Sequence, residues 1–495
     1  MKTKKWHGYL IIAILISVLT SSCKKGGDPA PPPVPDPPAE PPAFDINSIG
    51  DTYSSLAPVA NYLQWGPYNV HDPSIVKSGE YFYAFSTDVA YGATIRPGIQ
   101  IRRSKDLVQW NYVGWVFNGL PPMGSGFITQ GGGTPFQSLW APYVIKAGNE
   151  FRLYYSLSCS LPRLSVIGLA TATNPEGPWK EQGLVVVSKN DNTVQTNAID
   201  PSVVITPGGE HWLYYGSAWD GIYVVKLNPA TGMAQNGGDK GVRIAQRGFT
   251  NGIVNGNIEG PEIIFNAAQN KYYLFIAYDW LETKYNVRVG RSDSPQGPFL
   301  DYKGNDLNLE KDDGPMILAP YKFQLHGGWQ GVAHCSVFED NGQYFMAHQG
   351  RPGVDKYYMV MHVRKIFWTQ DGWPVVSPER YANTAQASVA SAELTGEWER
   401  IVMNYTVTPG YANEQTSPDF QSSVNMVLNA DGKIDGNAAH AWSYTSPWLT
   451  LSWSNGASVE KVYISRERDW ENKKTSVLVF TGLNQEGTAV WGKKK

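Results

Sequence analysis

HDPSIVKSGEYFYAFST, residues 71–87, combines a short apolar strand, a polar turn with a glycine, and an aromatic strand. Four later stretches repeat this design: WAPYVIKAGNEFRLYYS (140–156), IDPSVVITPGGEHWLYYGS (199–217), EGPEIIFNAAQNKYYLFIA (259–277) and AHCSVFEDNGQYFMAHQG (333–350). Several repeats continue into two further strand-like stretches, as in IQIRRSKDLVQW (99–110) and VIGLATATNPEGPW (166–179). Five units of four strands each predict an all-β fold, a five-bladed β-propeller.

Aligning the five repeats places one residue of each at an equivalent position near the start of the first strand. These residues are Asp72, Ala141, Asp200, Gly260 and His334. The first strand of a propeller blade lines the central channel, so we expect these residues to converge on one mouth. Asp72, Asp200 and the neighbouring Glu259 would then form a group of three carboxylates.

A single Asp at a strand start is more often a turn or capping residue than a catalytic one. Two Asp-Pro-Ser starts at Asp72 and Asp200, with a Glu-Gly-Pro start at Glu259, favour a shared site over three separate turns. Carboxylates held close together raise one another's pKa, which lets one of them stay protonated and act as a general acid.

The composition favours a neutral ligand that can stack on aromatic rings. Charged residues make up 17% of the 495 residues and the net charge is -3, which gives no basic face for nucleic acid. With 18 Trp and 28 Tyr, such a ligand has many aromatic faces to stack on. His71, Trp140, Ser217 and Trp219 lie beside the predicted mouth and are candidate substrate-binding residues, although either Trp could serve only in packing.

The N-terminus indicates export. Lysines precede an apolar run from Tyr9 to Leu19, which has the length of a signal-peptide core. The run ends in LTSSC, which resembles a bacterial lipoprotein cleavage site with Cys23 as the lipidated residue; an ordinary secretory signal is the alternative. We therefore expect a protein of the bacterial cell envelope, periplasmic or on the cell surface, that meets the membrane only through its lipid anchor. Cys159 and Cys335 are predicted to be buried thiols.

Composition shifts divide the rest of the chain. Residues 24–43 are rich in proline and predict an extended linker. The propeller is expected over residues 44–381. From residue 382 to 495, short strand patterns joined by tight turns predict a small β-barrel or sandwich, which either supports the propeller by packing or binds carbohydrate. We expect a monomer.

The motifs VHDPSI, LWAPYV, NAIDPSV, NIEGPEI and AHCSVF, in this order, resemble glycoside hydrolase family 43. LYYGSAWDGI and YNVRVGRSDSPQGPFLDYKG are similar to its endo-α-1,5-L-arabinanases, and the resemblance covers about residues 44–381. It implies an inverting hydrolase that cleaves internal bonds of arabinan. It also implies that Asp72 is the general base, that Glu259 is the general acid, and that Asp200 raises the acid's pKa and orients it. His334 would lie beneath the site and help to hold one mostly hydrated calcium ion.

Some alternatives stay open. Family members often have Glu-Ala-Pro where this chain has Glu259-Gly260-Pro261, and Glu262 is a rival for the acid role, although strand alternation favours Glu259. An inverting pair, Asp72 and Glu259, would stand about 6.5–9.5 Å apart to admit a water. His334 could be a hydrogen-bonding histidine without a metal. An exo-acting arabinofuranosidase, a β-xylosidase, and a non-catalytic glycan-binding lipoprotein are the alternative functions.

Overall fold

The computed structural model describes residues 44–50, 62–91, 94–193, 195–250, 253–254, 257–311, 314–404 and 415–495. The predicted signal peptide, Cys23 and the proline-rich linker lie outside the described residues. In the described part, no helix has both the length and the apolar character that crossing a membrane requires.

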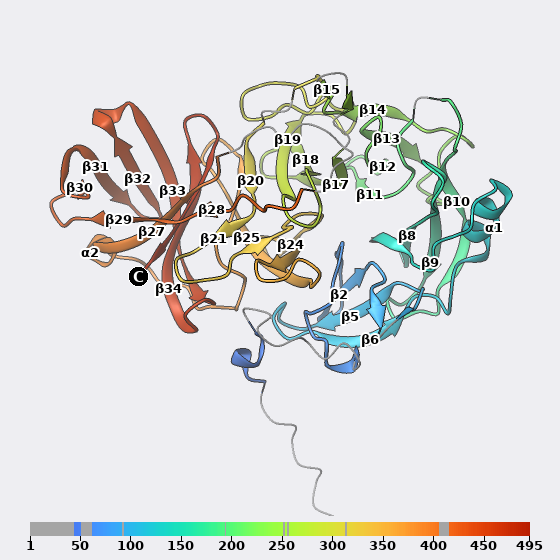
Figure 1. Cartoon of the computed structure of the whole chain (residues 1–495), viewed down its shortest axis with the longest axis horizontal. Coiled ribbons are helices and arrows are strands. Elements are labelled where there is room, and N and C mark those ends of the chain that lie inside the picture. Colours follow the sequence, from blue (N-terminus) through green and yellow to red (C-terminus); the bar gives the residue numbers. More distant parts are fainter. Residues whose placement is uncertain are drawn as a thin grey trace, which may run out of the picture. The chain divides into compact units, whose positions relative to one another are not determined.

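Four antiparallel sheets of four strands each, among the described residues, match the first four repeats. Their strands follow one another around a centre in Figure 1, from blue through cyan and green to yellow-green. The bounds are β1 (Ser74–Ser78), β2 (Tyr81–Ser86), β5 (Gln100–Ser104) and β6 (Asn111–Trp115); β7 (Trp140–Ala147), β8 (Glu150–Ser158), β9 (Ser165–Ala172) and β10 (Lys180–Ser188); β11 (Ser202–Ile205), β12 (His211–Tyr215), β13 (Ile222–Leu227) and β14 (Val242–Ala245); β17 (Ile258–Asn266), β18 (Lys271–Tyr278), β19 (Asn286–Ser292) and β20 (Met316–Leu318).

The fifth repeat differs from the prediction of five separate four-stranded blades. Its strands β23 (Cys335–Asp340), β24 (Gln343–Pro352), β25 (Val360–Trp368) and β26 (Pro374–Val376) pair in sequence. They belong, however, to a seven-stranded sheet that also contains β21 (Tyr321–Lys322), β22 (Trp329–Gln330) and β28 (Gln421–Ser422). The reason is the length of β24, which runs on past its partner β23 and pairs with β22.

The first strands of the five repeats form a closed ring. β1 contacts β7, β7 contacts β11, β11 contacts β17, β17 contacts β23, and β23 contacts β1. At four of its five steps, a side chain of one first strand accepts a hydrogen bond from a backbone N–H of the next. The acceptor and donor pairs are Ser74 and Val144, Ser202 and Ile263, Glu262 and Val337, and Ser336 and Ile75.

The aligned position has the same unusual backbone conformation in all five repeats. The φ angles are 49° at Asp72, 36° at Ala141, 58° at Asp200, 57° at Gly260 and 52° at His334. A positive φ is uncommon outside glycine, and it costs about 1–3 kcal/mol when the surrounding structure imposes it. The shared conformation confirms that the sequence alignment placed equivalent residues together. Each acceptor side chain of the ring lies two residues further along the chain.

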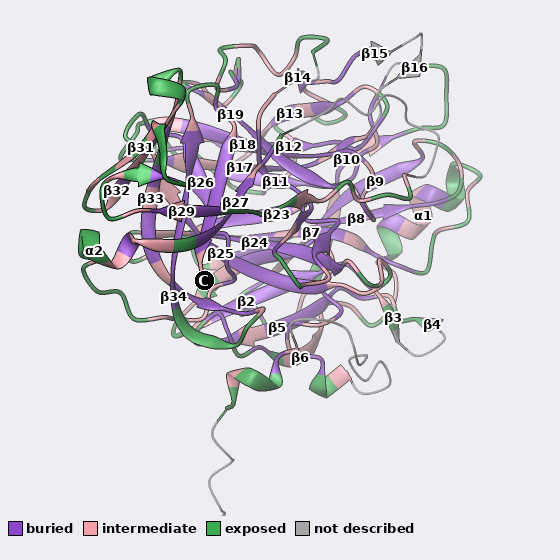
Figure 2. Ribbon diagram, turned by 60° about the vertical axis from the view of Figure 1, so that its left-hand side comes forward, coloured by how far each residue is buried: buried purple, intermediate pink, exposed green. Residues whose placement is uncertain are grey.

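Apolar side chains fill the spaces between neighbouring sheets. Figure 2 shows the sheets mainly in the colour of buried residues, with exposed residues in the connections. Tyr155, Leu157 and Val166 of the second repeat, for example, pack with Phe85 and Ile101 of the first. Cys159 and Cys335 are free, buried thiols, as predicted.

The C-terminal strands close into an eight-stranded barrel rather than a sandwich. Its strands are β27 (Gly396–Val402), β29 (Val424–Leu428), β30 (Lys433–Ile434), β31 (Asn437–Thr445), β32 (Trp448–Trp453), β33 (Ser458–Asp469), β34 (Lys474–Asn484) and β35 (Ala489–Lys494). The barrel stands at the left in Figure 1.

The helices of the described residues are α1 (Pro122–Gln130) and α2 (Ser391–Leu394). Two short hairpins are formed by β3 (Ala90–Tyr91) with β4 (Thr94–Ile95), and by β15 (Phe249–Thr250) with β16 (Ile253–Val254).

The barrel and the fifth repeat share one apolar core. Leu483 and Trp491 of the barrel pack in the same cluster as Trp329, Trp373 and Val375. A separate cluster, with Trp398, Leu451 and Phe480 among its members, fills the barrel interior. The barrel therefore encloses a packed core, and its outer wall faces the propeller.

A buried ionic cluster lies at the same junction. Glu379, Asp469 and Glu471 have the spacing of metal ligands, and among the described residues they are the one such group of three. Lys493 lies between them, with its Nζ 3.0 Å from Glu379, 3.0 Å from Asp469 and 2.5 Å from Glu471. The ammonium group takes the place that a cation would need, so this cluster joins the barrel to the end of the propeller and is not a metal site.

Candidate active site

Asp72, at the start of the first repeat, is surrounded by donors. Thr87 Oγ1 donates to Oδ2 at 2.6 Å, His71 Nδ1 lies 3.0 Å from the same oxygen, and His334 Nδ1 lies 3.1 Å from Oδ1. Burial alone would raise the pKa of this carboxyl, but the interactions with His334, His71 and Thr87 together lower it below its usual value. Asp72 is therefore ionised and able to accept a proton.

Arg351 fixes the orientation of His71. Its guanidinium donates to His71 Nε2 at 3.2 Å, so the hydrogen of the imidazole is at Nδ1 and points to Asp72. The backbone N–H of Asp72 donates to Gln349 Oε1 at 3.3 Å. Both Arg351 and Gln349 belong to β24 of the fifth repeat, so the first and fifth repeats together position this carboxylate.

Glu259 is held by two hydroxyl groups. Ser217 Oγ donates to Oε2 at 2.7 Å, and Tyr285 OH donates to Oε1 at 2.6 Å. Burial, with the charges of Glu259, Asp200 and Asp72 nearby, raises the pKa of Tyr285 well above its usual value, so its hydroxyl stays protonated and keeps donating. The carboxyl group of Glu259 is thus held in one orientation while the side chain remains partly exposed.

The charges of both Glu259 and Asp72 act on Asp200. Burial, then the charge of Glu259, then that of Asp72, raise its pKa well above the usual value, against a hydrogen bond that Oδ2 accepts from Gly260 N at 3.2 Å. The Asp200 carboxyl group therefore keeps its proton to a higher pH than an exposed aspartate does.

The close approach of His334 explains why this repeat has Gly260 where Glu-Ala-Pro would have alanine. A Cβ at Gly260 would stand 2.9 Å from His334 Nδ1, which is closer than real Cβ contacts. In this chain the His334 ring therefore lies directly against the backbone of β17. The same ring faces Asp72, so His334 touches two of the strands that carry the carboxylates.

Glu262, the rival for the acid role, belongs to the ring of inner strands. It is buried, and its carboxyl group accepts hydrogen bonds from Ser202 Oγ at 2.8 Å and from Val337 N at 2.6 Å. Burial raises its pKa to about 8. Through these contacts Glu262 joins three repeats. This structural role favours Glu259 as the acid.

The four predicted substrate-binding residues divide into two groups. His71 and Ser217 contact the predicted catalytic carboxylates directly. Trp140 instead donates to Ser138 Oγ at 3.0 Å and stacks on Phe136, with ring centroids 5.3 Å apart. Trp219 is 37% exposed and carries Arg163 over its ring at 5.3 Å.

The residues that support the carboxylates were not all identified from the sequence. Thr87, Tyr285, Gln349 and Arg351 contact them or their partners, but none lies at the aligned position. Thr87 directly follows β2 of the first repeat, and Gln349 lies near the end of the corresponding strand, β24, in the fifth. The ends of these second strands were therefore the signal that could have identified two of the four.

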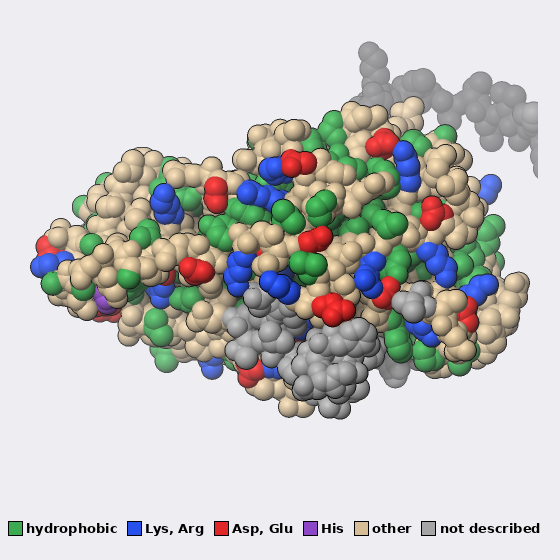
Figure 3. Space-filling model, turned by 90° about the horizontal axis from the view of Figure 1, so that it is seen from above, with side chains coloured by type: hydrophobic (Ala, Val, Ile, Leu, Met, Phe, Trp, Pro, Cys, Tyr) green, Lys and Arg blue, Asp and Glu red, His purple; other side chains and the backbone are tan. Residues whose placement is uncertain are grey.

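The surface of the molecule carries both charges. On the face seen in Figure 3, Lys and Arg side chains are interspersed with Asp and Glu side chains. This distribution fits the small net charge of -3 and a neutral ligand better than a charged polymer.

Comparison with known proteins identifies the two parts of the chain. The model of the family "Glycosyl hydrolases family 43" matches residues 66–374, and that of a "C-terminal lipocalin-like domain" matches residues 378–492. An extracellular endo-alpha-(1->5)-L-arabinanase of Thermotoga petrophila is 28% identical over 469 residues, which cover 86% of this chain and 93% of that protein. An extracellular exo-alpha-(1->5)-L-arabinofuranosidase of Cellvibrio japonicus is 29% identical over 321 residues, which cover 62% of this chain and 86% of that protein.

A solved structure agrees with the sequence comparison. The crystal structure of the endo-1,5-alpha-L-arabinanase from Thermotoga petrophila superimposes with a TM-score of 0.74 at 27% identity, and the match covers 88% of this chain and 99% of that one. The match extends over both the propeller and the barrel. Since the family model covers more than half of the chain, this protein belongs to glycoside hydrolase family 43.

Proposed function

We propose that this protein hydrolyses internal α-1,5-L-arabinofuranosidic bonds of arabinan with inversion at the anomeric carbon. The observation that carries the proposal is the convergence of three carboxyl groups from three repeats, in which Asp72 is held ionised, and burial and the charges of Glu259 and Asp72 raise the pKa of Asp200. That combination is what a hydrolase with separate base and acid requires. The closed ring of five first strands supports the proposal that the catalytic part is a five-bladed propeller.

Asp72 is the general base in this proposal. His71, Thr87 and His334 keep its carboxylate ionised, so it can take a proton from the attacking water. The water then attacks the anomeric carbon from the side opposite to the departing oxygen. Because Arg351 and Gln349 hold the surroundings of Asp72, the base needs little reorganisation during the reaction.

Glu259 is the general acid that protonates the departing glycosidic oxygen. The hydroxyl groups of Ser217 and Tyr285 fix its orientation. Asp200 lies close enough to Glu259 for their charges to interact, and a neighbouring carboxylate favours the protonated form of an acid. Asp200 is accordingly a positioning and pKa-raising residue.

Endo action is favoured by the extent of the similarity. The relative named as an endo-acting arabinanase matches over both the propeller and the barrel, whereas the relative named as exo-acting covers 62% of this chain. Both relatives are named as extracellular. Together with the apolar run and Cys23 at the N-terminus, this supports an exported protein that a lipid anchors to the bacterial cell envelope.

We also propose that His334 helps to hold one weakly bound, mostly hydrated calcium ion. Burial lowers the pKa of His334, so the imidazole is neutral and keeps a lone pair for a cation. Its Nδ1 faces Asp72, which leaves Nε2 as the ligand atom. Calcium prefers oxygen ligands, so waters would complete the shell. When bound, the ion would supply positive charge that favours the ionised form of nearby carboxylates.

Amide substitutions should separate the two catalytic residues from the structural Glu262. Asp72→Asn and Glu259→Gln each remove a proton transfer, and we expect turnover on arabinan to fall by at least about 10²–10⁴-fold. The matched control is Glu262→Gln, which should retain most of the turnover because this carboxyl joins strands. Steady-state rates with thermal unfolding curves measure both effects. Loss of activity in Glu262→Gln with Glu259→Gln still active would reverse the assignment.

Asp200→Asn should move the high-pH limb of the pH–rate profile to lower pH. The general acid works only when protonated, and in the proposed mechanism a negative charge on Asp200 opposes loss of that proton. Without that charge the acid should lose its proton at lower pH, so activity should end earlier as pH rises. The profile of kcat/KM from pH 4 to 10, measured for both proteins, tests this. An unshifted high-pH limb would contradict the role given to Asp200.

Removing calcium should depress activity, and adding it back should restore activity. Calcium should also raise the unfolding temperature of the chelator-treated protein, because a ligand that binds the folded state stabilises it. The same addition should leave the unfolding temperature of His334→Ala unchanged. If the parent protein showed full activity after verified metal removal, His334 would be a hydrogen-bonding residue only.

Digestion of linear arabinan tests the proposed function directly. Endo action predicts a mixture of arabino-oligosaccharides early in the digest, separated by chromatography. Release of arabinose alone from the first time point would favour the exo alternative. Xylan and branched arabinan serve as parallel substrates, and cleavage of xylan without cleavage of arabinan would overturn the proposal.

A further inference from the structure

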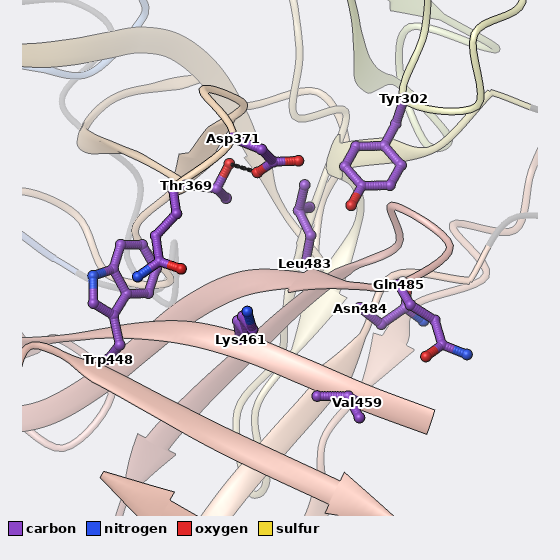
Figure 4. Close-up of a pocket in the computed structure, with 10 residues that line it drawn as sticks. Tyr302, Thr369, Asp371, Trp448, Val459, Lys461, Leu483, Asn484 and Gln485 are labelled. Atoms are coloured by element: carbon purple, nitrogen blue, oxygen red, sulfur yellow. Dashed lines mark hydrogen bonds between the residues drawn. The ribbon is translucent and has the colours of Figure 1, made fainter. Parts of the chain in front are cut away.

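A cavity of about 450 Å³ lies on the outer wall of the barrel, at its junction with the propeller. Barrel residues such as Trp448, Lys461 and Asn484 line one side, and Tyr302 and Asp371 of the propeller line the other (Figure 4). We propose that this cavity is a second carbohydrate-binding site, which takes a stretch of the arabinan chain away from the catalytic carboxylates. The inference rests on the proposed function for the identity of the sugar.

The site lies outside the barrel because its interior is occupied. Trp398, Leu451 and Phe480 belong to the apolar cluster that fills it. A ligand of the C-terminal domain must therefore bind to the wall. The volume of the cavity is within the range of about 300–1,000 Å³ that is usual for small-molecule sites. None of the residues that line it carries a catalytic role in the proposed reaction.

Two aromatic rings on opposite sides of the cavity are fixed by their neighbours. The indole of Trp448 packs edge-to-face on Tyr463, with centroids 5.3 Å apart, and Tyr463 stacks on Phe367 of β25 at 4.4 Å. Tyr302 packs on Trp373 at 5.4 Å. Both rings are partly exposed. Immobile aromatic faces at the edge of a cavity bind the apolar faces of sugars without loss of side-chain entropy.

Polar groups between the rings suit hydroxyl groups. Thr369 Oγ1 donates to Asp371 Oδ1 at 2.6 Å and orients this carboxylate, as the dashed line in Figure 4 shows. Asn484 Oδ1 accepts from the backbone N–H groups of Glu486 and Thr488, at 2.9 Å each, which fixes the plane of its amide. Oriented carboxylate and amide groups can accept from and donate to the hydroxyls of a sugar.

The charges in the cavity favour a neutral ligand. Asp371 and Lys461 are exposed and of opposite sign, one on the propeller side and one on the barrel side. Asp371 would repel an anionic polymer, and Lys461 would repel a cationic one. A neutral polysaccharide with many hydroxyl groups can hydrogen-bond to both.

A second site on the same rigid unit affects polymers and short substrates differently. A long chain can bind the cavity and the catalytic site at once, which raises its effective affinity. A short oligosaccharide can occupy only one site at a time. Loss of the cavity should therefore weaken binding of arabinan while leaving the chemistry on a trisaccharide unchanged.

Calorimetric titration of the full-chain Glu259→Gln protein with linear arabinohexaose tests the inference. We expect two bound hexaoses per chain. Adding Trp448→Ala should leave one, and Asp371→Ala, on the other side of the cavity, should also leave one. The matched control is Trp453→Ala, because Trp453 lies on the same strand, β32, but packs on His440 outside the cavity. Unfolding temperatures check that each variant is folded.

Kinetics of the active protein provide the second measurement. Trp448→Ala should raise KM for linear arabinan about 3- to 10-fold and leave kcat/KM for arabinotriose unchanged. One hexaose per chain in the parent, or two in both cavity variants, would overturn the inference and leave the proposed function standing. Absence of any binding, together with no cleavage of arabinan by the unsubstituted protein, would overturn the proposed function and this inference with it.

Discussion

The first strands of the five repeats contact one another in a closed ring, and at four of its five steps a side chain accepts a hydrogen bond from the backbone of the next strand. Because the ring closes, no first strand can slide along its neighbours without disturbing these contacts. The left-handed residue two positions earlier is thereby fixed at the same level in every repeat. The catalytic arrangement depends on this constraint, since Asp72 and Asp200 occupy that position and Glu259 precedes it.

The same constraint keeps the carboxylates close enough to affect one another. Burial of Asp200 beside Glu259 and Asp72 is electrostatically unfavourable, and it persists because the inner strands cannot move apart. The cost is offset elsewhere, in the apolar packing between repeats and in the core shared by the fifth repeat and the barrel. The barrel thus supports the propeller, and its outer wall adds the cavity beside Trp448.

The repeat pattern was sufficient to predict the propeller and the residues that meet at its mouth, because strand alternation and turn residues are local properties of the sequence. Asp72, Asp200 and His334 were placed by alignment alone. Their supporting residues were not, since Tyr285 directly precedes β19 and Arg351 belongs to β24, both away from the aligned position. The merging of the fifth repeat into a seven-stranded sheet also depends on pairing between distant segments, such as β21 with β28. Glu262 was a rival of Glu259 for the acid role in the sequence, and its contacts show that it joins strands.

The central claim is that Asp72 and Glu259 act on opposite sides of the glycosidic bond. Proton NMR of the first products formed from a linear arabino-oligosaccharide tests this claim most directly, because it reports the configuration of the new reducing end before it equilibrates. The account predicts that the β-anomer appears first from the α-linked substrate and that the α-anomer follows by mutarotation. Initial appearance of the α-anomer would mean retention through a covalent intermediate, and it would contradict a mechanism in which Asp72 activates a water.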